Sequence, residues 1–61
     1  MDEALRAYEA GRADAGEGSR SASRAADART GSDYRMGFLD GRIEVFRMLA
    51  EIRRILDADL P

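Results

Sequence analysis

The hydrophobic and polar positions along this chain follow a helical period in two stretches and lose it between them. Over residues 2–15 most residues are good helix formers, and a thin stripe of alanine, leucine and tyrosine recurs every three or four positions. Over residues 33–58 a longer stripe alternates steps of four and three, the spacing of heptad a and d positions. Its members are Tyr34, Phe38, Gly41, Val45, Met48, Ile52 and Ile55, with Leu49 widening it on one side. The pattern predicts a short first helix and a second helix of roughly 39 Å.

Residues 16–32 separate the two stripes. They open with glycines on which a helix commonly ends and continue as a run of serine, arginine and alanine without apolar periodicity. We expect a linker in which residues 22–29 can form a short helix. Gly31 is expected to close that stretch and Ser32 to cap the helix that follows. The chain is therefore predicted to be one small all-α domain, a helix–linker–helix hairpin.

One short motif, Tyr-x-x-Gly-x-x-Asp, occurs twice in the chain. Its first copy is Tyr8, Gly11 and Asp14, and its second, 26 positions later, is Tyr34, Gly37 and Asp40. Positions three apart lie on neighbouring turns of one side of a helix, so each copy places a ring, a gap and a carboxylate along one edge. Such an edge suits close docking of another backbone, and the two tyrosines are expected to be packed.

Gly37 and Gly41 call for an explanation because each glycine inside a helix costs about 1 kcal/mol relative to alanine. We expect an antiparallel hairpin in which these glycines pack against the alanines of the first helix. The alternative is that the gap they leave receives a nucleotide, a phosphate or a loop of a partner.

A chain of 61 residues buries only about 60% of its unfolded surface, so a self-contained core would be marginal. The chain has no cysteine and no histidine, which excludes disulfides and thiolate zinc sites. The first helix offers too little apolar bulk to cover the broad stripe of the second, so we expect a homodimer formed through the second helix. The interface residues predicted are Tyr34, Gly37, Phe38, Gly41, Val45, Met48, Leu49, Ile52 and Ile55.

Charge is unevenly distributed along a chain whose net charge is −2. Residues 1–18 carry a net −3 and residues 19–35 a net +2, and all ten basic residues are arginine. The acidic residues considered as a partner-binding surface are Glu9, Asp14, Glu17, Asp40 and Glu44. The basic residues considered for RNA or phosphate binding are Arg20, Arg24, Arg29 and Arg35, whose alternative is a solvated linker.

The sequence argues against an enzyme. Without histidine or cysteine, the usual general base, thiolate nucleophile and most metal sites are missing, and we expect no cofactor. Asp40 and Glu44 could share a helical face, but one carboxylate pair on a lone helix provides neither a cavity nor enough ligands for a metal. No segment approaches the roughly 20 apolar residues of a membrane span. Asp2 and Glu3 stand where a secretory signal would be basic, so we expect a cytoplasmic protein without membrane contact.

The glycine and aromatic spacing resembles that of the ribosome modulation factor family and its small phage-encoded relatives. The matching residues are Ala7-Tyr8-Glu9-Ala10-Gly11 in the first half and Tyr34-Arg35-Met36-Gly37-Phe38-Leu39-Asp40-Gly41-Arg42 in the second. The resemblance covers roughly residues 4–42 and implies a helix–linker–helix fold and, for the cellular family, binding to the ribosome. The chain departs from that family by being acidic and by continuing into an apolar extension over residues 43–60.

Binding functions therefore remain. The favoured hypothesis is a phage-type inhibitor or adaptor of anti-defence kind, which would dimerise and present acidic helix faces to a basic surface of a host protein complex. The alternatives are an RNA or ribosome binder and a small nucleotide-binding oligomer.

Overall fold

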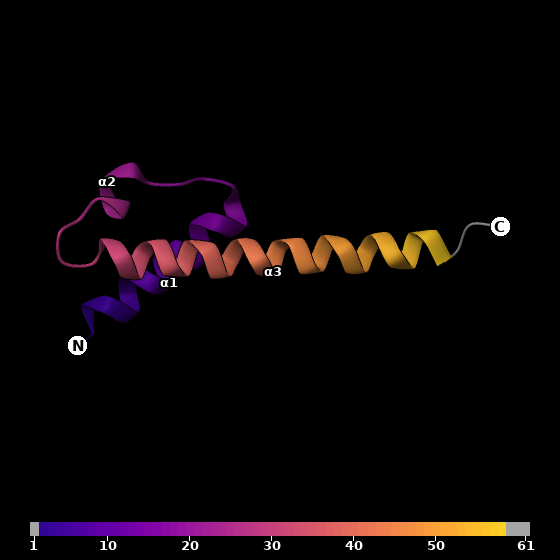
Figure 1. The fold of residues 1–61 in the computed structure, drawn as a ribbon, viewed down its shortest axis with the longest axis horizontal. Helices are drawn as coiled ribbons and strands as arrows, with labels where there is room; N and C mark the ends of the chain where they lie inside the picture. Colours follow the sequence, from indigo (N-terminus) through magenta and orange to yellow (C-terminus); the bar gives the residue numbers. More distant parts are fainter. Residues whose placement is uncertain (1, 59–61) are drawn as a thin grey trace.

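The computed structural model describes residues 2–58, which form three helices and no strand (Figure 1). The helices are α1 (Glu3–Glu17), α2 (Ala22–Ala25) and α3 (Gly31–Ala58). α1 lies across the first half of α3, and the second half of α3 extends beyond it to give an elongated molecule of 53 × 22 × 13 Å. The prediction of an all-α chain with a short first and a long second helix is confirmed.

α1 is closed at both ends by local hydrogen bonds. The carboxylate of Asp2 accepts a hydrogen bond from the backbone N–H of Leu5 at 3.2 Å, which satisfies one of the free donors of the first turn. At the other end Gly18 adopts the left-handed conformation, with φ 71°, and its N–H is donated to the carbonyl of Ala15 at 3.2 Å. The helix therefore runs two residues further than the predicted boundary at residue 15.

The linker contains one helical turn where the sequence allowed a helix over residues 22–29. The Ser21 hydroxyl caps α2 by accepting from the backbone N–H of Arg24 at 3.3 Å. Beyond α2, the Asp27 carboxylate accepts from the backbone N–H groups of Thr30, at 3.0 Å, and Arg29, at 2.8 Å. These two hydrogen bonds, that from Thr30 first, hold the pKa of Asp27 below its usual value, because they stabilise the charged carboxylate. Asp27 thus shapes the turn that leads into α3.

α3 begins at Gly31, two residues earlier than predicted. Gly31 is the first residue of α3 instead of closing the preceding segment, and Ser32 lies inside the helix instead of capping it. A Cβ at Gly31 would lie 2.6 Å from the carbonyl oxygen of Ala25. Glycine is needed here for the close approach of α2 to the start of α3.

The predicted antiparallel hairpin is wrong, because α1 and α3 run in the same general direction (Figure 1). Glu3, at the start of α1, pairs with Arg29 just before α3, while Ala15, near the end of α1, lies against Gly41 in the middle of α3. The connection over residues 18–30 runs back along the molecule from the end of α1 to the start of α3. Extended, it could span roughly 40 Å, well beyond the roughly 22 Å length of α1, so a parallel arrangement is open to this chain.

The buried part of the molecule is very small. Among the described residues, the only buried apolar side chains are Ala15, Ala25 and Tyr34, and Tyr34 is 1% exposed. The stability of the isolated chain therefore depends on the crossing of α1 over α3.

Candidate interaction surface

The two copies of the repeated motif bind each other. The hydroxyl of Tyr8 on α1 donates a hydrogen bond to the carboxylate of Asp40 on α3, and the hydroxyl of Tyr34 on α3 donates to the carboxylate of Asp14 on α1. Tyr34 also accepts a hydrogen bond from the backbone N–H of Ser21 at 2.9 Å, which attaches the linker to the crossing. The 26-residue repeat is thus a reciprocal clasp in which each tyrosine binds the aspartate of the other copy.

The glycines of the motif bring the two backbones into contact. A Cβ at Gly37 would overlap the carbonyl oxygen of Tyr8, and a Cβ at Gly11 would overlap the carbonyl oxygen of Tyr34. A Cβ at Gly41 would lie 2.7 Å from that of Ala15, so a glycine of α3 does pack against an alanine of α1 as expected. The space between these glycines is filled by α1, so the alternative of a nucleotide, phosphate or partner loop in that gap is wrong.

The clasp raises the pKa values of both tyrosines. The hydrogen bond to Asp40 and then burial raise the pKa of Tyr8, whereas burial and then the hydrogen bond to Asp14 raise the pKa of Tyr34. In both cases the tyrosinate is disfavoured, because it would face a carboxylate and would lose the proton that forms the hydrogen bond.

Alkaline pH is therefore expected to open the clasp. Because the folded pKa values lie above the unfolded value of about 10, the stabilisation from Tyr8 and Tyr34 is complete below about pH 10 and is lost as the pH rises through the folded values. Circular dichroism should report a loss of helix that coincides with the rise of tyrosinate absorbance. The variant Tyr8→Phe should lose one of the two titrations. Tyrosines that titrate at their ordinary pKa while the helix signal stays constant would contradict the clasp.

The five acidic candidates divide into three that form contacts between α1 and α3 and two that are exposed on α1. Asp14 and Asp40 accept from the tyrosines, and Glu44 on α3 forms an ion pair with Arg12 on α1. These three side chains therefore hold the crossing together, and their part in a partner-binding surface stays a prediction. Glu9 and Glu17 are exposed on α1.

The four arginines predicted for RNA or phosphate binding do not act as one group. Arg29 is paired with Glu3 at 2.7 Å, and Arg24 belongs to the single turn of α2. Arg20 and Arg35 do line one hollow, and they share it with Arg42, which is not among the four predicted arginines. Arg42 lies seven residues after Arg35 on α3, a helical spacing that could have indicated it.

The predicted interface residues also divide into two groups. Tyr34, Gly37 and Gly41 are buried against α1 within the same chain, so their assignment to an intermolecular interface is wrong. Phe38 and Val45 are half-buried at the margin of the crossing. The remaining predicted residues are exposed, together with Leu56, which was not in the predicted set. We call these five residues the tail face of α3: Met48, Leu49, Ile52, Ile55 and Leu56.

The tail face continues the face of α3 that α1 covers. Ile52 follows Tyr34 by 18 residues, which is five turns at about 3.6 residues per turn, so both residues point in the same direction from the helix. Ile55 and Leu56 follow Gly37 and Phe38 by the same interval. The side chains of the tail face are 47–62% exposed, because α1 ends before it reaches them.

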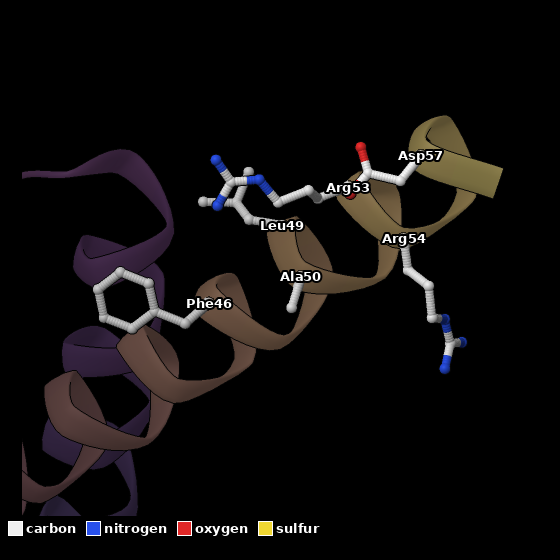
Figure 2. Close-up of a pocket in the computed structure, with 6 residues that line it drawn as sticks. All are labelled: Phe46, Leu49, Ala50, Arg53, Arg54 and Asp57. Atoms are coloured by element: carbon white, nitrogen blue, oxygen red, sulfur yellow. The ribbon is translucent and has the colours of Figure 1, made fainter. Parts of the chain in front are cut away.

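A neighbouring hollow on the same half-helix has only one wall. Figure 2 shows its lining residues, all of which come from α3: Phe46, Leu49, Ala50, Arg53, Arg54 and Asp57.

Other kinds of site find no support within residues 2–58. The acidic residues there form no group of three or more that could hold a metal ion. The described helices include none that is long and apolar enough to cross a membrane. Comparisons with protein-family models, with curated proteins and with solved structures find no match to this chain.

Proposed function

We propose that this chain is a non-catalytic helical binding protein that pairs with a second copy of itself through the tail face of α3. One observation carries this proposal. The face of α3 on which α1 packs continues along the second half of the helix, where the described residues leave it uncovered. Apolar side chains on that half-helix stabilise the protein only once they are removed from water. A small chain with so few buried residues gains stability by oligomerising.

The position of α1 favours an antiparallel pair. α1 lies on the same face of α3 as the tail face and ends close to Val45. Two parallel tails would force the two α1 helices into the same space between the long helices. Antiparallel tails instead place each α1 beyond the end of the partner's α3, so that α1 and the partner's tail follow one another along a single face.

The charges beside the tail face lead to a salt dependence. Glu51, which pairs with Arg54 of the same helix, lies along one edge of the face, and Arg53 lies along the other, because residues on either side of Ile52 point about 100° away from it. In an antiparallel pair, edges of the same kind meet, so like charges face one another. Added salt screens this repulsion while the apolar contact remains.

Sedimentation equilibrium of the full-length chain over a range of protein and salt concentrations tests the proposal. We expect a monomer–dimer equilibrium that shifts toward dimer as salt increases. A chain that stays monomeric at every concentration would overturn the proposal. Dimers that dissociate with added salt would overturn the antiparallel arrangement.

We further propose that the dimer acts as an inhibitor or adaptor on a host protein complex, of the anti-defence kind, by presenting acidic residues of α1 to a basic surface. The residues available for this role are Glu9 and Glu17, which are exposed. A tagged wild-type chain should capture one nuclease-resistant complex from a host lysate at moderate salt. The double variant Glu9→Gln, Glu17→Gln should still dimerise but lose the complex, and equal capture by both would exclude this role.

A further inference from the structure

A hollow lies along the edge of the α1–α3 crossing at which the 26-residue repeat is broken. On the opposite edge, Arg12 of α1 and Glu44 of α3 form an ion pair across the crossing. In the other copy of the repeat, Phe38 stands at the position that corresponds to Arg12, and Gly18 stands at the position that corresponds to Glu44. Phe38 and Gly18 cannot form an ion pair. Gly18 has no side chain and turns the backbone away in the left-handed conformation. This edge of the crossing therefore stays open.

Two adjoining spaces occupy the open edge and share Arg20, Phe38 and Arg42. The smaller has a volume of about 190 Å³ and is completed by Arg35 and Leu39. The larger, of about 290 Å³, is mainly apolar, and its other lining residues are Ala15, Gly18, Val45 and Phe46. Among residues 2–58, three guanidinium groups and no carboxylate line the two spaces. The edge therefore combines a basic compartment with an aromatic one.

Two of the three arginines are held in place by contacts that leave most of their donors free. Arg35 donates one N–H to the backbone carbonyl of Ala25. The guanidinium of Arg42 lies over the ring of Phe46, 5.6 Å from its centroid, and this contact uses no N–H group. A guanidinium carries five N–H donors, so both side chains can still bind an anion. Their fixed positions reduce the entropy lost on binding.

We propose that this edge binds a nucleoside monophosphate or diphosphate. The phosphate is held by Arg20, Arg35 and Arg42, because planar guanidinium groups match phosphate oxygens with paired hydrogen bonds. The base lies in the larger compartment against Phe38 and Phe46, since aromatic rings stack on bases of any sequence. This site is separate from the tail face, so it does not depend on self-association.

The charge distribution favours a compact anion over a nucleic acid strand. Residues 1–18, which include α1, carry a net charge of −3, and the whole chain carries −2. A long polyanion that ran beyond the three arginines would meet acidic surface, whereas a single nucleotide would contact only the basic edge.

Titration of the isotope-labelled full-length chain with AMP and ADP, followed by amide NMR shifts, tests the proposal. We expect saturable shifts confined to residues 15–20 and 35–46. Inorganic phosphate and adenosine serve as separate probes of the two compartments, and each should bind more weakly than AMP. Arg42→Gln and Arg20→Gln should each weaken AMP binding at least about tenfold, the usual effect of losing a charge-assisted hydrogen bond.

The matched control is Arg53→Gln, which removes the same charge from α3 outside the two spaces and should leave AMP affinity unchanged. Circular dichroism of each variant verifies the fold.

Absence of any shift with AMP or ADP at millimolar concentration would overturn the site. Adenosine that binds as tightly as AMP would refute the role of the arginines, and phosphate that binds as tightly as AMP would refute the aromatic compartment. A single-stranded RNA that binds the same amides more tightly as its length increases would replace the compact ligand with a nucleic acid.

Discussion

Replacing Gly37 with alanine is expected to separate α1 from α3. The added Cβ would overlap the carbonyl oxygen of Tyr8, and backbone atoms of Tyr8 lie on the same side, so no flexible side chain can move away to make room. Overpacking typically costs about 1–3 kcal/mol, and a single core of this size rarely supplies more than about 3–5 kcal/mol. The variant should therefore lose most of its folded population. Thermal unfolding followed by circular dichroism, together with the tyrosine titration, measures the loss.

Gly16→Ala is the matched control for this substitution. Gly16 also lies inside a helix, and a Cβ there would meet nothing within 4 Å. Alanine is a better helix former than glycine, so this variant should be more stable by about 0.5–1 kcal/mol. The same change of residue is thus expected to have opposite effects at the two positions. Gly37→Ala that is as stable as the wild type would contradict the close backbone contact.

Replacing Ile52 with aspartate is expected to abolish the proposed dimer. Burying an isoleucine side chain contributes roughly 1.5–3 kcal/mol, and a symmetric pair loses this contribution twice. The loss of about 3 kcal/mol or more corresponds to a dimer dissociation constant weaker by over about a hundredfold. Sedimentation equilibrium should find a monomer at concentrations at which the wild type is paired.

Ala50→Asp serves as the matched control for the tail face. Ala50 lies two residues before Ile52 and points to the opposite side of α3, so the same charge and the same helix propensity are introduced away from the proposed contact. This variant should pair as the wild type does. Equal weakening by both substitutions would show that the added charge, and not the tail face, controls association.

The spacing of the repeated motif contains part of the information that specifies the crossing of α1 and α3. This spacing indicated that ring, gap and carboxylate share one edge of a helix, and that the glycines admit another backbone. The spacing could not show that the partner of each copy is the other copy. Hydrogen bonds such as those from Tyr8 to Asp40 and from Tyr34 to Asp14 join residues 32 and 20 positions apart, and depend on where the linker returns the chain.

The pattern along one helix does not identify which charged residues are available for binding. Arg42 belongs to the open edge because the crossing of α1 leaves a space beside it, and a single helix pattern contains no information about that space. Conversely, Asp14, Asp40 and Glu44 counted as surface charges in the sequence but are engaged between α1 and α3. A charged residue is free or engaged according to its tertiary neighbours.

The sequence by itself determined the helices of this protein. Local hydrogen bonding and the period of the apolar stripe are properties of neighbouring residues, so α1, α3 and the breadth of the α3 stripe followed from them. Only the tertiary structure decided that α1 and α3 run in the same direction, that the two motif copies clasp each other and that the described part of the chain leaves the stripe uncovered beyond Val45. These features depend on the path of the linker and on contacts between distant residues, for which the periodicity of a single helix carries no signal.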